Sequence, residues 1–138
     1  MAQKNVELVR RIWEAAEHRE DEALFALYDP DIVWQSHYVG PMETGGLYRG
    51  HEGIRRFFRD WLESFDAYEA RAETFIEVGD QVVVGYRVTG RGKGSGVRVD
   101  MPRWNVYRLR NALVTHVEVF DSKDEALASL SSEDSGRS

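Results

Sequence analysis

Two ionisable side chains stand two residues apart near the C-terminal end of the chain, in a segment typical of a β-strand. His116 and Glu118 occupy alternate positions of the stretch ALVTHVEVF, so strand geometry places both on one face. An imidazole and a carboxylate on one face can accept and donate a proton, and this pair therefore predicts acid–base chemistry or a polar ligand. We expect both side chains to point into the interior, with Phe120 on the same face.

Two preceding strands contribute further polar side chains to the same interior. Tyr86 alternates with valines in DQVVVGYRVTG. Arg103, Asn105 and Tyr107 share one face of VRVDMPRWNVYRLR. If the inner faces of the three strands coincide, these groups meet in an otherwise apolar pocket. We predict that the reactive groups are Glu118, His116, Asn105 and Arg103, and that the substrate-binding walls are Trp34, Ser36, Tyr86, Tyr107, Phe120 and Trp61.

Each reactive group also has a structural interpretation. Glu118 is flanked by valines, where a buried carboxylate is costly unless it is paired or protonated. It is therefore either a general acid or base, or a partner that balances the charge of Arg103 or His116. Asn105 either donates a hydrogen bond to a ligand carbonyl or satisfies a buried neighbour. The sequence leaves both interpretations open.

The composition is that of one soluble domain. The chain has 138 residues, a net charge of −6 and no cysteine, which excludes disulfides and thiol catalysis and argues against nonspecific nucleic-acid binding. The four histidines show no metal-ligand spacing, and the glycine-rich GRGKGSG precedes a strand rather than the helix that a phosphate site needs. We expect no metal, no cofactor and no nucleic-acid or membrane partner. Because the sequence shows no signal segment or membrane span, we expect a cytoplasmic protein.

The pattern of apolar residues predicts three helices and a set of strands. Helical periodicity covers residues 5–18, 21–28 and 51–65, with a strand at DIVWQSH between the second and third helices. From Tyr68 the period changes to two and continues through four strands, followed by a short helix over SKDEALASL and an expected disordered tail over residues 131–138. This order predicts an α+β domain over residues 1–130, with the helices on one face of an antiparallel sheet.

The opposite face of that sheet carries large apolar residues. Trp104 and Val106 alternate with Asn105 and would expose an apolar patch unless another subunit covered it. We therefore expect a homodimer formed through the outer face of the sheet.

Three segments together resemble the SnoaL-like proteins of the nuclear transport factor 2 (NTF2)-like superfamily. They are NVELVRRIWEAAEHREDEALFALYDPDIVW, YRGHEGIRRFF and the closing VFDSKDEAL, and the resemblance covers about residues 4–130. It implies an NTF2-like (cystatin-like) fold, a cone-shaped barrel in which a curved antiparallel sheet and three helices of the N-terminal half enclose a pocket, usually in a homodimer. It does not imply one activity, since this fold hosts isomerases, cyclases, hydrolases and binding proteins.

The resemblance narrows the possible chemistry. Ketosteroid isomerases use a base, a tyrosine and a protonated aspartate; the corresponding positions here carry Ser36, Ile12 and Asn105, so this reaction is not expected. Limonene-type epoxide hydrolases use an Asp–Arg–Asp arrangement that corresponds to Asn105, Arg103 and Glu118, with one carboxylate replaced by an amide. SnoaL-type polyketide cyclases need an inward acid or base, which the same glutamate or its histidine neighbour would supply.

The expected function is therefore a cofactor-independent isomerase, cyclase or epoxide hydrolase. Glu118 and His116 would act on a small, mostly apolar molecule with a few polar groups. Because Glu118 would stand beside Arg103 in the pocket, we expect an uncharged ligand rather than an anion. The alternative is a non-catalytic ligand-binding or dimeric assembly protein of the same superfamily.

Overall fold

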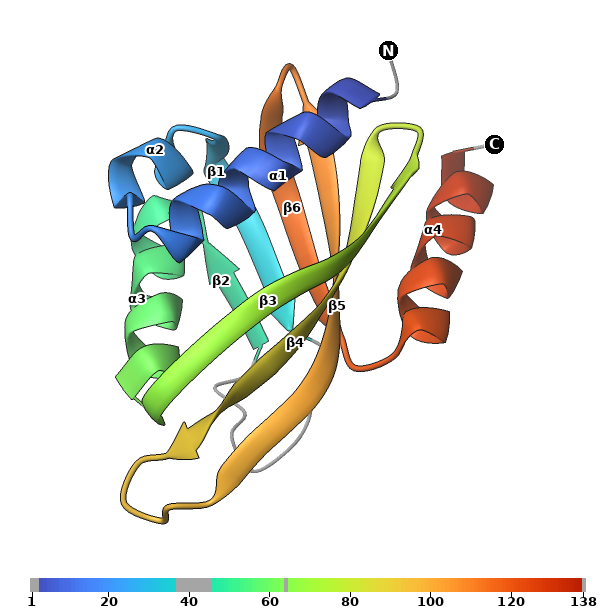
Figure 1. The fold of residues 1–138 in the computed structure, drawn as a ribbon. Coiled ribbons are helices and arrows are strands. Elements are labelled where there is room, and N and C mark those ends of the chain that lie inside the picture. The colour runs from blue at the N-terminus through green and yellow to red at the C-terminus, as the bar shows by residue number, and fades with distance from the viewer. Residues whose placement is uncertain (1–2, 37–45, 64, 138) are drawn as a thin grey trace.

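The computed structural model describes the backbone of residues 3–36, 46–63 and 65–137, and within these ranges the side chains from residue 4 to residue 130. In chain order the elements are α1 (Gln3–Glu17), α2 (Asp21–Phe25), β1 (Tyr28–Ser36), β2 (Gly46–Arg49), α3 (Gly50–Glu63), β3 (Phe65–Val78), β4 (Gln81–Gly92), β5 (Arg98–Arg110), β6 (Leu113–Phe120) and α4 (Lys123–Arg137). The fold is α+β, as the sequence predicts: α1, α2 and α3 lie on the concave side of a curved sheet and α4 on its convex side (Figure 1). The sheet is open rather than closed into a barrel.

The sheet contains one parallel pair. Its strand order is β2-β1-β6-β5-β4-β3, and every neighbouring pair is antiparallel except β1 and β6. This differs from the wholly antiparallel sheet that the sequence predicts. A parallel pair needs a long crossover, and here α3 and the four strands β2, β3, β4 and β5 lie between β1 and β6 along the chain. The short strand β2 has no counterpart among the predicted elements and extends the sheet beyond β1.

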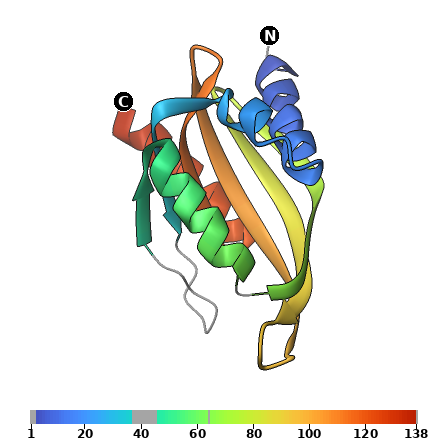
Figure 2. The same ribbon diagram turned by 90° about the vertical axis from the view of Figure 1, so that its left-hand side faces the viewer.

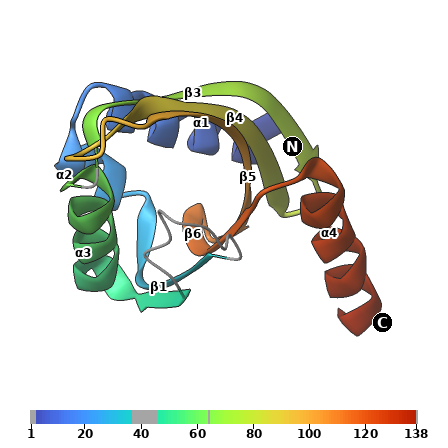
Figure 3. The same ribbon diagram turned by 90° about the horizontal axis from the view of Figure 1, so that it is seen from below.

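Bulges give the sheet its curvature. The register of β3 against β4 shifts between Phe65 and Ala67 and again between Ala72 and Thr74. A bulge bends its strand and increases the local twist. Figures 2 and 3 show the long strands curling around the side on which α1 and α3 lie, so that the concave side can enclose a volume.

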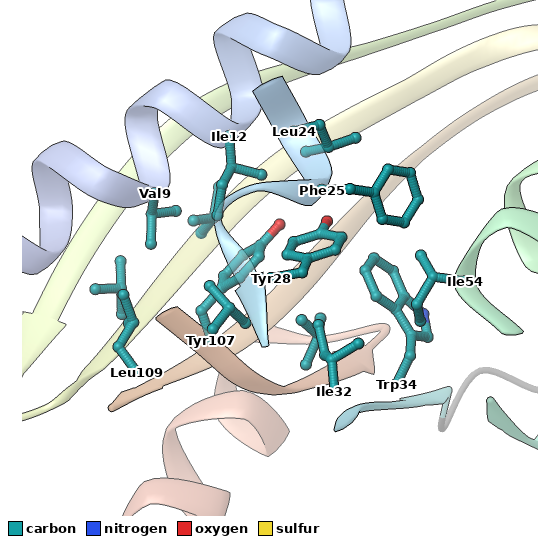
Figure 4. Packing of buried hydrophobic residues seen from close by; sticks show 14 of the residues in the cluster. Val9, Ile12, Leu24, Phe25, Tyr28, Ile32, Trp34, Ile54, Tyr107 and Leu109 are labelled. Carbon is teal, nitrogen blue, oxygen red and sulfur yellow. The ribbon is translucent and has the colours of Figure 1, made fainter. Parts of the chain in front are cut away.

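The three helices of the concave side each bury one apolar face. α1 contributes Val9 and Ile12 to the main core, and α3 contributes Ile54 (Figure 4). A carboxylate of the sheet also holds α1 in place, because Glu77 Oε1 accepts a hydrogen bond from the backbone N–H of Val6 at 3.2 Å. This bond satisfies a donor near the start of the helix, where negative charge is favourable.

The convex face of the sheet is apolar too, and α4 covers part of it. Ala126 and Leu130 of α4 pack with Val83, Val106 and Phe120 in a second buried cluster. The sheet is therefore apolar on both faces of β4, β5 and β6. Each face has its own helical cover.

The segment after β6 forms a longer helix than predicted. α4 begins after Ser122, whose hydroxyl accepts a hydrogen bond from the backbone N–H of Glu125 at 3.2 Å. The helix takes in most of the segment 131–138. The disordered tail and the domain boundary expected there stay predictions, because the side chains of that segment lie outside the described residues.

Trp104 is half-buried on the convex face beside α4. Its ring lies over Gly85, and Lys123 Nζ is 5.9 Å from the ring centroid. Val106, the other half of the expected apolar patch, is only 1% exposed because α4 packs on it. The chain itself thus provides the cover that was expected from a second subunit. The homodimer stays a prediction, now without this argument for it.

Gly85→Ala should destabilise the fold, because a Cβ at this position would lie 2.5 Å from the Trp104 ring. We expect a loss of about 1–3 kcal/mol in the free energy of unfolding, which is the usual cost of overpacking, measured by urea denaturation. In a Trp104→Leu background the loss should become small, since the obstructing ring is gone.

Gly90→Ala is the matched control for this double-mutant cycle. Its Cβ would overlap the backbone carbonyl of Ala67, which Trp104→Leu does not remove. Its cost should therefore be the same in both backgrounds. If Gly85→Ala also cost the same in both, the indole would not be what limits the space above Gly85.

Candidate functional site

A cavity of about 870 Å³ lies between the concave face of the sheet and the helices α1, α2 and α3. Seven of the ten predicted site residues line it: Arg103, Asn105, Tyr86, Tyr107, Trp34, Ser36 and Trp61. Their roles stay predictions, but the structure brings them together around one volume. The other three predicted residues do not line this cavity, and they are considered below.

A chain of hydrogen bonds crosses the floor of the cavity between β4 and β5. The phenol of Tyr86 donates to Asn105 Oδ1 at 2.9 Å, and Asn105 Nδ2 donates to the Tyr107 oxygen at 3.2 Å. The Asn105 amide thus accepts a hydrogen bond from one phenol and donates a hydrogen bond to the other. Since Tyr107 acts as the acceptor, its own O–H hydrogen remains available for a further acceptor.

Burial raises the pKa values of these phenols further above the physiological range. It raises the pKa of Tyr107 to about 12, against the opposing effect of the hydrogen bond from Asn105. Burial also raises the pKa of Tyr86 well above its usual value, reinforced by Tyr68 and Tyr107 and opposed by Arg103. Both phenols are therefore neutral hydrogen-bond donors at physiological pH.

Arg103 places a positive charge at the same wall. It is 6% exposed and stands opposite Tyr86 in the pairing of β4 with β5. Its guanidinium donates to the Pro102 carbonyl at 2.7 Å and contacts Met101 Sδ at 2.8 Å. Arg103 therefore places a guanidinium beside the hydrogen-bonded phenols of the cavity.

Aromatic side chains of β1 and α3 form another part of the cavity wall. The Trp34 ring lies 5.3 Å from Phe57 and 5.5 Å from Phe58, measured between centroids, and Trp61 stacks on Phe57 at 6.3 Å. Trp34, Phe57 and Phe58 also belong to or pack against the main core. They therefore serve both as core and as an apolar surface toward the cavity.

The structure adds cavity residues that the sequence prediction lacks. Trp13 packs on Tyr86 at 4.8 Å between ring centroids, and Phe25, Tyr28 and Tyr68 also line the cavity. The apolar stripe of the first helix is the signal that could have placed Trp13 there. Exposed charged residues of both signs line the same volume from the helices and from the turn after α1: Glu14, Glu17, Arg19, Asp21, Arg55 and Arg59.

The predicted pair on β6 faces the other way. Val117 pairs with Tyr107, and Val119 pairs with Asn105, so the valines share the inner face. His116 is exposed, with Nδ1 3.1 Å from Thr115 Oγ1. The alternation places its strand neighbours Glu118 and Phe120 on the convex face as well. The expected inward orientation of these three residues is wrong.

The convex face provides partners for them. Glu118 Oε1 accepts a hydrogen bond from the Arg108 guanidinium at 2.9 Å, and Arg108 Nε donates to Gln81 Oε1 at 3.3 Å. Phe120 packs in the second core cluster beneath α4. Glu118 is therefore a paired carboxylate, and the partner that the structure shows is Arg108, which the sequence analysis did not name.

A bulge explains why strict alternation fails on β6. Arg108 pairs with His116, but the next residue, Leu109, pairs with Val114, so β6 contains one extra residue at Thr115. Val114 and Val117 are both fully buried although three positions separate them. Counting by twos from Val114 gives the wrong face for every residue after the bulge.

This placement removes the acid–base pair from the cavity. The arrangement of Asn105, Arg103 and Glu118 expected from the epoxide hydrolases is not assembled, because the glutamate lies across the sheet. No histidine is among the described residues that line the cavity. Within the described ranges there is also no group of three or more potential metal ligands, and no helix is long and apolar enough to cross a bilayer.

Comparison with known proteins assigns this chain to a family. The family model described as the SnoaL-like domain matches residues 9–117. An NTF2-like protein from Burkholderia thailandensis E264 superposes with a TM-score of 0.78 at 24% identity, covering 89% of this chain and 96% of its own. A protein from Jannaschia sp. CCS1, named after SnoaL-like polyketide cyclases, gives 0.74 at 25% identity, covering 87% of this chain and 86% of its own. TerC, crystallised with polyporic acid, gives 0.75 at 22% identity, covering 88% of this chain and 94% of its own. No curated protein sequence matches the chain.

Tyr107→Phe should flatten the loss of stability at alkaline pH. An unfolded tyrosine ionises near pH 10.0, whereas the pKa of Tyr107 is about 12 in the folded protein. The stabilisation is complete below pH 10 and is lost as the pH rises toward 12, by about 1.4 kcal/mol per pH unit for this group. Urea denaturation of wild type and variant across this range measures the difference. Identical slopes would mean that the Tyr107 phenol is solvated.

Proposed function

This chain belongs to the SnoaL-like domain family, and we propose that it binds a flat, mostly apolar small molecule in the cavity of its curved sheet. An acceptor oxygen of the ligand would accept a hydrogen bond from the Tyr107 hydroxyl, at the end of the Tyr86–Asn105–Tyr107 chain. The ring system of the ligand would lie against Trp34, Phe57 and the other aromatic residues of the wall.

One observation carries this proposal. The Tyr107 hydroxyl, which accepts a hydrogen bond from Asn105, can still donate one inside a cavity with an aromatic wall. A volume of about 870 Å³ falls within the range of roughly 300–1,000 Å³ that small-molecule sites occupy. Such sites combine apolar walls with a few fixed polar groups, and these groups set the orientation of the ligand. Asn105 is suited to this role because it is 3% exposed and both ends of its amide are held by phenols.

The relatives support a small organic ligand. TerC was crystallised with polyporic acid, and the Jannaschia protein is named after polyketide cyclases. Both names point to oxygenated organic molecules rather than to nucleotides or metals. The likeness at 22–25% identity supports the class of ligand and leaves its identity to experiment.

Binding is preferred over acid–base catalysis because of the groups that line the cavity. Its described carboxylates are Glu14, Glu17, Asp21 and Glu69, and all four residues are exposed. A base that abstracts a proton inside a dry site must reach the reacting atom within hydrogen-bond distance. The buried floor instead offers donors and a cation, which hold a substrate oxygen but do not take up a proton.

A cyclase or isomerase is the second candidate. The observation that favours it is the joint presence of a neutral buried phenol and the Arg103 guanidinium on one wall. Fixed donors of this kind stabilise the negative charge that develops on a carbonyl oxygen during enolisation or ring closure. Epoxide hydrolysis fits less well, since it also requires a group that activates water.

Calorimetric titration with matched probes tests the binding proposal. 2-Acetylnaphthalene and 2-ethylnaphthalene have similar size and shape, but only the ketone offers an acceptor oxygen. The ketone should bind wild type more tightly than the hydrocarbon, and Tyr107→Phe should weaken the ketone about tenfold, which corresponds to one hydrogen bond. His116→Asn, on the convex face, is the control and should leave both affinities unchanged.

Larger probes test whether the naphthyl compounds fail to bind only because they are too small for the cavity. If neither the naphthyl compounds nor an anthraquinone or a steroid ketone bound the wild type, the binding proposal would be wrong. Mass spectrometry of recovered β-polyketone probes then separates the two candidates. Unchanged probe mass and structure favour binding alone, and a cyclised or isomerised product favours the enzyme.

A further inference from the structure

The hydroxyl of Tyr28 is a polar group of the cavity that the proposed binding mode does not use. Tyr28 is the first residue of β1, is 3% exposed and lines the cavity. No described residue forms a hydrogen bond with its side-chain hydroxyl. A buried hydroxyl without a partner costs stability. A phenylalanine would fill the same space without that loss, and the hydroxyl is therefore a candidate ligand contact.

The Tyr28 side chain is held in a fixed position. Its ring packs nearly perpendicular to the Phe25 ring, with 5.5 Å between the centroids, and belongs to the main core. Its backbone carbonyl lies 3.0 Å from His51 Nε2. The carbonyl of Leu27 accepts a hydrogen bond from the backbone N–H of Val114 at 2.9 Å, which ties the start of β1 to β6. A polar group on such a rigid support can bind a ligand with little entropic cost.

Tyr28 and Tyr107 lie close to each other on the concave face. Val114 of β6 pairs with Tyr28 on one side and with Leu109 on the other. Tyr107 lies two residues before Leu109 on β5, and both phenols line the cavity. Figure 4 shows the two rings directed to the same side of the sheet. Neighbouring strands are about 4.8 Å apart, and on a concave face the ends of the side chains converge.

The electrostatic coupling of the two phenols supports this proximity. Burial raises the pKa of Tyr28 well above its usual value, and Tyr107 raises it further, because two neighbouring phenolates would repel each other. Tyr28 and Tyr107 are therefore both neutral at physiological pH, and each has an O–H hydrogen to donate. Tyr86 differs from them, because its O–H already donates to Asn105 Oδ1 at 2.9 Å.

From this placement we infer that the cavity binds a ligand of the diketone class, with two acceptor oxygens on one edge of its ring system. One oxygen accepts a hydrogen bond from Tyr107 and the other accepts one from Tyr28. The inference rests on the proposed binding function and names its ligand class. Two donors on a rigid sheet favour such a ligand over a ketone with one oxygen, because the ketone leaves one buried hydroxyl unpaired.

A series of probes with one skeleton tests the number of oxygens. Acenaphthenequinone, acenaphthenone and acenaphthene are flat and carry two, one and no oxygens, and both oxygens of the quinone lie on one edge. Calorimetry should show that wild type binds the quinone about tenfold more tightly than the ketone, which corresponds to one hydrogen bond. Tyr28→Phe should abolish this preference by weakening the quinone alone. The ketone, held by Tyr107, should keep its affinity.

Tyr48→Phe is the matched control. Tyr48 is 8% exposed and belongs to the same core, but it is not among the described residues that line the cavity. The substitution removes a buried phenol hydroxyl in the same way and should leave the affinities for all three probes unchanged. If Tyr48→Phe weakened the quinone as much as Tyr28→Phe does, the loss would come from the packing of the core, and the inference would be wrong.

A second pair of probes covers another spacing of the two oxygens. 1,8-Diacetylnaphthalene carries both carbonyl groups on one edge of a naphthalene, and their rotation makes the distance between the oxygens adjustable. 1-Acetylnaphthalene is its partner with one oxygen. At least one of the two diketones should bind wild type about tenfold more tightly than its partner, and Tyr28→Phe should remove that difference.

Infrared spectroscopy of the bound diketone needs only the wild-type protein. A carbonyl group that accepts a hydrogen bond vibrates at a lower frequency than the same group in an apolar solvent. An isotopic label on one carbonyl carbon separates the two stretching bands of the diketone, and both bands should be lowered in the complex. A bound diketone with one unshifted carbonyl would overturn the inference, even if Tyr28→Phe failed to fold.

The outcomes separate this inference from the binding proposal. If neither diketone binds wild type more tightly than its partner, or if Tyr28→Phe keeps the preference, the diketone class is wrong and the binding function stands. If wild type binds none of these probes and none of the larger ketones, the binding function itself fails. A preference for a diketone in wild type and its loss in Tyr28→Phe support both.

Discussion

The pairing of β5 with β6 decides which polar groups can meet a ligand. Asn105 and Tyr107 lie on the concave face opposite Val119 and Val117, and this register places valines rather than ionisable groups between β5 and β1. A single-residue slip would bring Glu118 into the cavity and expose valines on the other side. The bulge at Thr115 fixes the observed register, so the chemistry of the cavity depends on one extra residue in an edge-free part of the sheet.

Much of the fold follows from the sequence, and the reason is the regularity of its patterns. The helices around Ile12 and Phe58 have strong apolar stripes. Tyr86, Asn105 and Tyr107 lie on β4 and β5, whose pairing with each other has no register shift, so the common face expected for them is correct. β2 escapes prediction because it has only four residues, too few to show an alternating pattern beside the loop that precedes it. The parallel pairing of β1 with β6 depends on contacts between distant segments, which local periodicity does not contain.

The error on β6 has a different origin. Its residues are apolar on both faces, because the concave side meets the main core and the convex side meets α4. Alternation of apolar and polar residues identifies a face only when one side of a strand is solvated. Phe120 suggested an inward face, and it is indeed buried, but under Ala126 and Leu130 rather than in the cavity. The polar residue Glu118 is tolerated there because Arg108 and Gln81 complete its network.

The two apolar faces of the sheet also have different roles: the convex face contributes mainly to stability, and the concave face contains the cavity. A cavity is unfilled volume within a core, and the loss of contacts around it costs stability. A buried guanidinium adds a further cost unless its hydrogen bonds and charge are compensated. The cluster beneath α4 includes Val83 and Val106, which are 0% and 1% exposed. Since β4 and β5 are anchored from that side, residues such as Asn105 and Tyr86 can serve a ligand on the other side. Substitutions beneath α4 should therefore act mainly on folding, and those on the concave floor mainly on what the cavity binds.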